Sequence, residues 1–187
     1  AGGLVFGITL VCVLVMPGSG SVLLEQRPAG DPVCRPGGGT SVCVWPEHEH
    51  RLAEAVTTAD KVARAAEGVL SPPARYTEQG LVRGGSGGFT LDHSSRDLLH
   101  TLLLQATDSS KRWCDTEPED QMQARMYAGL RLDAWLEARA TGSRTLPSYD
   151  YSGDTSWQDE VRHVLPLPER DQKETARKWV SAMGAPC

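Results

Sequence analysis

An uninterrupted apolar run near the amino terminus constrains the fold of this chain more than any other feature. Residues 4–16 (LVFGITLVCVLVM) carry no charge, and Thr9 is their only polar side chain. As a helix they span about 20 Å, which is less than the roughly 30 Å hydrocarbon core of a bilayer. We interpret residues 1–16 as the C-terminal part of a transmembrane helix. The alternatives are a remnant of a signal peptide and a buried core helix.

A flexible linker is predicted directly after this run. Residues 17–21 read Pro-Gly-Ser-Gly-Ser, which stops a helix and frees the chain. The remaining residues, 22–187, are enough for one domain with its own core. We expect this part to be a disulfide-stabilised helical domain outside the cytoplasm. The N-terminal helix would then attach the protein to the cell membrane.

The cysteines support an oxidising compartment. Cys12 lies within the apolar run, and the other four are Cys34, Cys43, Cys114 and Cys187. An even number in an exported chain indicates two disulfides, for which three connectivities exist. Cys34 and Cys43 flank a turn-rich loop, so we expect them to close a hairpin, with Cys114 and Cys187 tying the chain end to the middle. A zinc site is the alternative, but the Cys-x-x-Cys spacing is absent.

The charge of the chain argues against two classes of partner. Its net charge is −5, with acidic and basic residues well mixed. A nucleic-acid-binding domain would carry a basic patch, and docking on anionic lipid headgroups would also need excess positive charge. We therefore expect no nucleic-acid partner.

The patterning predicts a mainly α fold of about five helices with a small β-sheet or hairpin near the N-terminus; an α+β fold is also compatible. Strands are expected at 21–27 and 41–45, with 76–82 as a candidate third strand. A helix opens at Pro46 and ends before Gly68. Three further helices are predicted from their starts: one capped by Ser94 or Ser95, one that runs from the Thr116-x-x-Glu119 capping box to about Ala140, and a short one capped by Asp154 or Thr155. The last helix is predicted from an apolar stripe formed by Ala176, Trp179, Val180 and Met183.

No motif in the sequence predicts catalysis, a cofactor or a metal. His48-Glu49-His50 is the densest His/Glu cluster, but its i, i+2 spacing differs from the i, i+4 pair of a helical zinc site. His93 and His100 have Ser and Asp neighbours, yet a Gly-x-Ser-x-Gly elbow is absent. We predict no catalytic, cofactor-binding or metal-binding residues.

Four residues are candidates for contacts with a partner: Trp45, His48, His50 and Trp113. Tryptophans gather in partner grooves and at membrane interfaces as well as in cores. Core burial is the better interpretation for most of the five tryptophans. Trp113 is the one that we expect to be exposed, because Lys111 and Arg112 precede it.

The segment from Cys34 to Gly80 carries a resemblance to a known group of proteins. Its Cys…Val-Cys-Val-Trp-Pro-Glu-His pattern, which includes Cys34, Cys43, Trp45, Pro46, Glu47 and His48, resembles extracytoplasmic segments of actinobacterial multi-pass membrane proteins. Those proteins are similar to ABC-type transporter permeases, some of which are related in layout to permeases with metallopeptidase modules. The resemblance covers about residues 4–80. It implies a final transmembrane helix followed by a helical extracytoplasmic domain; the peptidase motif His-Glu-x-x-His is absent.

We therefore expect a non-enzymatic extracytoplasmic domain of a membrane protein, a component of an ABC-type permease that acts in binding or gating. Its N-terminal helix would contact the membrane, and an ATP-binding transporter subunit would be a partner through the rest of the membrane protein. The alternatives are an exported hydrolase, perhaps metal-dependent through His48, Glu49 and His50, and a secreted binding protein.

Overall fold

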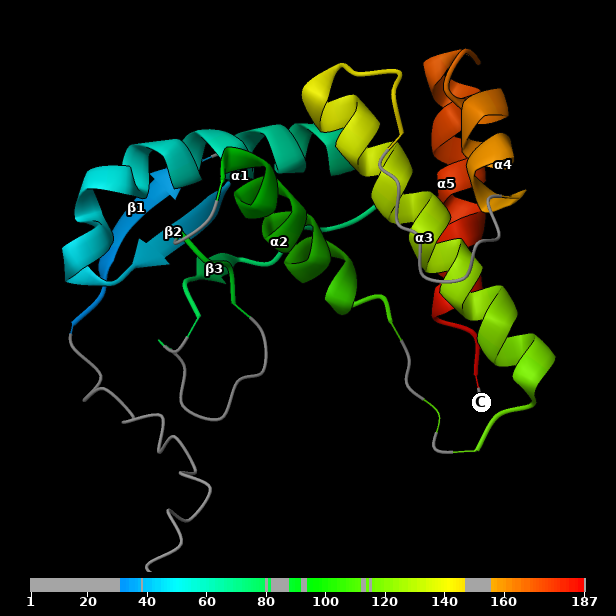
Figure 1. The fold of residues 1–187 in the computed structure, drawn as a ribbon, viewed down its shortest axis with the longest axis horizontal. Coiled ribbons are helices and arrows are strands. Elements are labelled where there is room, and N and C mark those ends of the chain that lie inside the picture. Colours follow the sequence, from blue (N-terminus) through cyan, green and yellow to red (C-terminus); the bar gives the residue numbers. More distant parts are fainter. Residues whose placement is uncertain are drawn as a thin grey trace, which may run out of the picture.

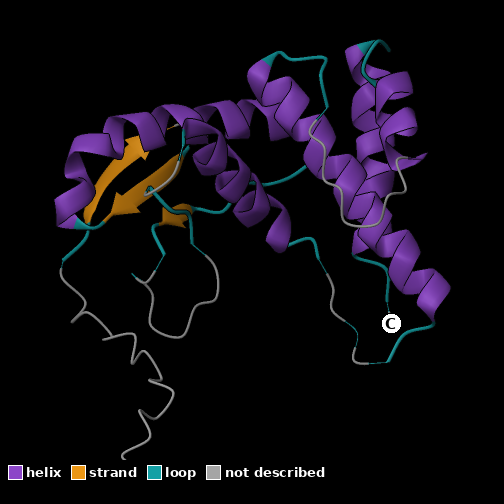
Figure 2. Ribbon diagram, viewed as in Figure 1, coloured by secondary structure: helices purple, strands orange, loops and turns teal. Residues whose placement is uncertain are grey.

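The computed structural model describes residues 31–37, 39–79, 81, 88–91, 94–111, 114, 116–146 and 156–186 of the chain. The apolar run, the linker and the strand predicted at 21–27 lie outside the described residues. The described part contains a small three-stranded sheet and five α-helices, and the third strand comes between the first and the second of these helices in the chain. The fold is α+β and mainly helical, which confirms the predicted class (Figures 1 and 2).

The sheet has three strands in the order β1-β2-β3: β1 (Val33–Gly37), β2 (Thr40–Val44) and β3 (Arg75–Thr77). β1 and β2 are antiparallel, and β3 runs parallel to β2. β2, which corresponds to the strand predicted at 41–45, therefore has a neighbour on each side. Pro36 is tolerated within β1 because this is an edge strand, where a missing N–H breaks no ladder.

The hairpin of β1 and β2 is closed by a disulfide. Cys34 lies directly opposite Cys43 in the antiparallel register, and the two sulfurs are bonded. The predicted pairing of these two cysteines agrees with the structure. Cys43 is buried against the core, whereas Cys34 is exposed.

The helix α1 (Leu52–Ala66) lies at the centre of the packing, between the sheet and the other helices. A 3-10 turn, η1 (Pro46–Arg51), leads into α1, which packs on β1 and β2, on α2 (Ser95–Asp108) and on α3 (Glu119–Thr141). α3 in turn packs against α4 (Ser156–Val164) and α5 (Glu169–Met183). In Figure 1, α1 therefore connects the sheet with the α3–α5 group.

The close contact between α1 and the sheet depends on a small residue. A Cβ added to Gly37 in β1 would lie 2.7 Å from Cγ1 of Val56 in α1. Side-chain atoms do not tolerate that separation, so a larger residue would push α1 away from the hairpin.

Three tryptophans hold the helical group together, as the core interpretation predicts. Trp135 in α3, Trp157 in α4 and Trp179 in α5 are all buried. The indole N–H of Trp135 donates to Gln172 Oε1 (3.1 Å), and that of Trp179 donates to Glu160 Oε1 (3.0 Å). The rings of Trp135 and Trp179 thus bury a large apolar surface and still satisfy their indole N–H donors.

The two ends of α3 differ from each other in how well the sequence predicted them. Gly142 ends the helix with φ 69°, the left-handed conformation expected of a glycine stop. At the start, the predicted capping box of Thr116 and Glu119 is wrong, because Pro118 occupies the cap position without a side-chain hydrogen bond. Met122 and Met126, in the first half of the helix, are exposed.

Arg125 in α3 joins the chain end to the loop before α3. Its guanidinium donates to both oxygens of Glu117, to the carbonyls of Met183 (2.7 Å) and Ala185 (3.0 Å), and to Cys114 Sγ (3.6 Å). Cys114 is disulfide-bonded. Its predicted partner, Cys187, lies outside the described residues, so the pairing stays a prediction that the nearby Ala185 supports.

None of the helices in the described part of the chain is both long enough and apolar enough to span a bilayer.

Candidate functional site

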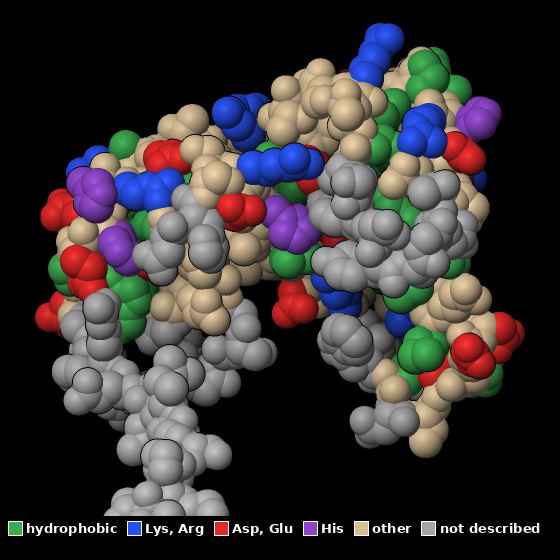
Figure 3. All heavy atoms as spheres, in the orientation of Figure 1, with side chains coloured by type: hydrophobic (Ala, Val, Ile, Leu, Met, Phe, Trp, Pro, Cys, Tyr) green, Lys and Arg blue, Asp and Glu red, His purple; other side chains and the backbone are tan. Residues whose placement is uncertain are grey.

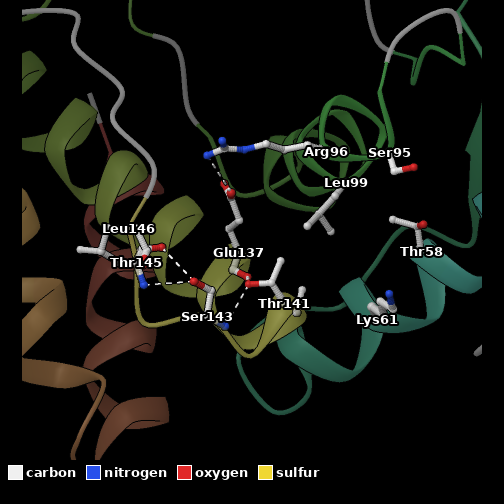
Figure 4. A pocket seen from close by; sticks show the side chains of 11 residues that line it. Thr58, Lys61, Ser95, Arg96, Leu99, Glu137, Thr141, Ser143, Thr145 and Leu146 are labelled. Carbon is white, nitrogen blue, oxygen red and sulfur yellow. Dashed lines mark hydrogen bonds and ion pairs between the residues drawn. The ribbon is translucent and has the colours of Figure 1, made fainter.

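A hollow of about 640 Å³ lies where α1, the start of α2 and the end of α3 meet (Figure 4). Thr58 and Lys61 line it from α1, where their spacing of three residues puts them on one face. The α2 wall consists of Ser95, Arg96 and Leu99. The third wall is formed by the end of α3 and the turn after it, through Glu137, Ala140, Thr141, Ser143, Thr145 and Leu146.

The α2 wall is fixed by the way this helix begins. Ser94 Oγ accepts from the Asp97 amide (3.3 Å), and the Asp97 carboxylate accepts from the Ser94 amide (3.1 Å). Of the two caps predicted, Ser94 or Ser95, the structure therefore has Ser94, and it forms a capping box with Asp97. Ser95 Oγ then donates to Glu54 Oε1 of α1 (2.6 Å). This hydrogen bond, with a further contribution from Arg51, lowers the pKa of Glu54. The start of α2 is therefore tied to α1, and the hollow between them has a defined shape.

An ion pair crosses the mouth of the hollow. Arg96 Nη2 lies 3.6 Å from Glu137 Oε1, and the two side chains are 71% and 11% exposed (Figure 4). The carboxylate is thus largely buried, while the guanidinium remains mostly in water. Because Arg96 has five N–H donors, it can hold Glu137 and still present donors to a ligand.

Three hydroxyl groups around the hollow already donate their hydrogens within the protein, so toward a ligand they can only act as acceptors. Thr58 Oγ1 donates to the Glu54 carbonyl (2.9 Å), and Thr141 Oγ1 donates to the Glu137 carbonyl (2.7 Å). The hydrogen of Ser95 is also used, as described above. Since a hydroxyl has one hydrogen and two lone pairs, these oxygens can still accept hydrogen bonds from a ligand.

A second hollow, of about 340 Å³, continues from the first between α1 and α3. It is lined by Lys61, Arg64, Ala65, Arg139 and Ala140, and it shares Lys61 and Ala140 with the first hollow. Arg139 is held in place by the Ala65 carbonyl (3.3 Å), by Glu169 (3.1 Å) and by the ring of Trp135. We call the two hollows together the cationic groove.

The charge in the cationic groove is opposite to that of the whole chain. Lys61, Arg64, Arg96 and Arg139 line it, and Glu137 is the one carboxylate among its described lining residues. Lys61 and Arg64 make no ion pair with any residue in the described part of the chain. Figure 3 shows Lys and Arg side chains on the face over α1 and α2. In a chain of net charge −5, this groove is a local positive field.

Two ionisable residues lie between α2 and α3, behind the groove. Burial raises the pKa of Asp133 to about 6, although Lys111 and a hydrogen bond from Thr107 act in the opposite direction. Burial also lowers the pKa of His100, against the attraction of Glu137 and Asp97. Asp133 Oδ1 is buried and accepts no hydrogen bond from the described residues. A change in the charge of Asp133 would change the electrostatic potential at Glu137, which lies one helical turn away on α3.

The predicted contact residues Trp45 and His48 form a different, structural cluster. Trp45 is 7% exposed; its amide donates to Glu78 Oε2 (2.8 Å) and its indole N–H to the Gln79 carbonyl (3.1 Å). His48 Nδ1 is hydrogen-bonded to Glu78 Oε1 (2.5 Å). The cluster joins the end of β2 to the end of β3, and Trp45 presents little surface to a partner.

The two histidines of the His48-Glu49-His50 cluster contact different partners. His50 Nδ1 contacts the backbone carbonyl of Glu47 (3.2 Å), away from the Glu78 contact of His48. Over the described ranges, no group of three His, Cys, Asp or Glu side chains is placed to hold a metal ion. Trp113, the fourth predicted contact residue, lies outside the described residues, as does His93.

The residues of the cationic groove were not singled out in the sequence. Arg96 and Glu137 are far apart along the chain, so no local pattern connects them. A weak signal exists for Lys61: the residues three and four positions away are Thr57, Thr58, Arg64 and Ala65, so no acidic residue can neutralise it along the helix.

Residues 42–185 match the family described as Domain of unknown function (DUF7224). No curated protein and no solved structure matches the chain. The matched range contains every residue that lines the cationic groove, and it begins after Cys34.

Proposed function

The chain belongs to the DUF7224 family, and we propose that it is an extracytoplasmic, non-catalytic binding domain of a membrane protein. The observation that carries this proposal is the use of the cysteines: Cys34 is bonded to Cys43, and Cys114 is disulfide-bonded as well. Disulfides of this kind persist in oxidising compartments and are rare in the cytosol. The apolar run at 4–16 supports attachment to a membrane.

A role in binding is supported by the cationic groove. Ligand sites are concave and combine apolar surface with a few polar groups that fix orientation. The groove has both, since Leu99, Ala140 and Leu146 lie beside charged and hydroxyl side chains. The resemblance of residues 4–80 to permease segments favours a transporter component, with an ATP-binding subunit as partner through the rest of the membrane protein.

The compartment can be tested by peptide mapping. The protein would be isolated from cells in the presence of an alkylating reagent, digested without reduction and analysed by mass spectrometry. We expect peptides that link Cys34 to Cys43 and Cys114 to Cys187. Recovery of all four as alkylated free thiols would overturn the proposed location.

Surface labelling of intact cells provides an independent test. Lys178 in α5 is 71% exposed, so an amine reagent that does not cross membranes should modify it. We expect labelling of Lys178 and recovery of the chain in the membrane fraction. Labelling only after lysis would contradict an extracytoplasmic domain, and recovery from the medium without membrane would contradict attachment.

A further inference from the structure

We propose that the cationic groove binds a small hydroxylated organic anion, of the class that includes sugar acids and sugar phosphates. This assignment rests on the proposed binding function and specifies its ligand. It is based on two features of the groove walls: cationic side chains without an ion-pair partner among the described residues, and hydroxyl groups that can accept hydrogen bonds.

The charge of the ligand follows from the cations. Lys61 and Arg64 lie on one face of α1 and make no ion pair with a described residue. Arg96 lines the first hollow from α2 together with Lys61, and its side chain is 71% exposed. An anionic group beside Lys61, which lines both hollows, would gain charge-assisted hydrogen bonds, and these are stronger than hydrogen bonds between neutral groups.

The size of the ligand follows from the shape of the groove. The two hollows, of about 640 and 340 Å³, are in the range of small-molecule sites. A long polyanion would extend beyond the groove over a chain whose net charge is −5, where it would be repelled. The geometry therefore points to a small molecule.

The hydroxyl groups of the ligand are inferred from the acceptors. Thr58, Ser95 and Thr141 already donate their hydrogens within the protein, so they can bind a ligand only through their lone pairs. A ligand that matches them must bring donors of its own. Leu99 and Leu146 offer apolar surface for the C–H face of a sugar ring.

Isothermal titration of the full chain in mild detergent tests this assignment. The probes are glucuronate and glucose 6-phosphate, which carry hydroxyls with a carboxylate or a phosphate. Glucose lacks the charge, and glutarate lacks the hydroxyls. We expect one of the two hydroxylated anions to bind at least about tenfold more tightly than glucose and glutarate. The tighter of the two then identifies the anionic group.

A matched pair of variants ties the binding to the groove. Lys61→Ala and Lys178→Ala remove the same charge, but Lys178 lies on α5 and does not line either hollow. We expect Lys61→Ala to weaken binding about tenfold or more and Lys178→Ala to leave it within about twofold. Equal effects of the two variants would overturn the site.

The other outcomes separate the ligand from the proposed function. Equal binding of glucose would overturn the anionic requirement, and equal binding of glutarate would overturn the hydroxyl requirement. If no probe binds while the disulfides and the surface labelling are found, the ligand class is wrong and the extracytoplasmic location stands. Binding to a chain with free thiols would support the ligand class and overturn the location.

Discussion

Asp133 is a buried carboxylic acid in α3 whose surroundings oppose its charge. Burial raises its pKa from 3.8 to about 6. Between these two values the folded protein binds more protons at this position than the unfolded chain does. The contribution of Asp133 to the free energy of unfolding therefore falls as the pH rises through this window. Above pH 6 its ionisation costs about 3 kcal/mol, as an order of magnitude.

Replacing Asp133 by Asn should remove this pH dependence. We expect the free energy of unfolding of wild type, relative to that of Asp133→Asn, to fall by about 2–3 kcal/mol between pH 4 and pH 7. Urea unfolding of both proteins at the two pH values measures this difference. A constant difference would show that Asp133 titrates normally in the folded protein.

Arg125 is a residue whose loss should be severe. It and Glu117 are 14% and 7% exposed, and the arginine also holds the carbonyls of Met183 and Ala185. Arg125→Met leaves a buried carboxylate and two carbonyls without their donor, so we expect the free energy of unfolding to fall by about 3 kcal/mol. Chemical denaturation measures the loss.

The control for this prediction is Arg170→Met, at a side chain that is 90% exposed. It should change the free energy of unfolding by no more than about 0.5 kcal/mol. If the unpaired carboxylate causes the loss, Arg125→Met combined with Glu117→Leu should be more stable than Arg125→Met alone. Similar stability of Arg125→Met and Arg170→Met would contradict the account.

At the scale of elements, two helix starts with similar sequence signals behave differently. Ser94 caps α2, whereas Thr116 does not cap α3. We expect Ser94→Ala to lower the free energy of unfolding by about 1 kcal/mol and Thr116→Ala to leave it nearly unchanged. Thermal unfolding of the two variants checks this, and an equal loss would mean that the cap at Ser94 contributes nothing specific.

The elements that the sequence predicted are those with strong local signals. The apolar stripes of α1, α2 and α5 and the glycine after α3 depend on neighbours within a few residues. β1 was missed because Cys-Arg-Pro-Gly has no strand-like alternation; its partner β2 and the disulfide stabilise it instead.

The site was less accessible to sequence reasoning than the fold. The cationic groove combines Lys61, Arg96 and Glu137 from three helices, and only the packing of α1 on α2 and α3 brings them together. His48 is the opposite case. It lies in the densest His/Glu cluster of the sequence, but in the structure it contacts the distant Glu78 and so belongs to the cluster of Trp45, His48 and Glu78. Clustering along the sequence is thus a poor guide to clustering in space.

At the scale of the whole molecule, one disulfide links residues that are close in sequence, and a second, predicted disulfide would link residues that are far apart. Cys34 and Cys43 are nine residues apart and close one hairpin. The predicted bond from Cys114 to Cys187 would close a loop that contains α3, α4 and α5. In the chain-entropy account, stabilisation by a disulfide increases with the logarithm of the loop length.

The two links should therefore differ in their effect on stability. We expect the double variant Cys34→Ala/Cys43→Ala to lose about 2–3 kcal/mol of the free energy of unfolding, and Cys114→Ala/Cys187→Ala to lose about 4–5 kcal/mol. Urea unfolding without reductant measures both. Dithiothreitol should then destabilise each variant only through the disulfide it retains. A smaller loss for Cys114→Ala/Cys187→Ala than for the hairpin variant would mean that Arg125 and the helix contacts, rather than the covalent link, hold the chain end on α3.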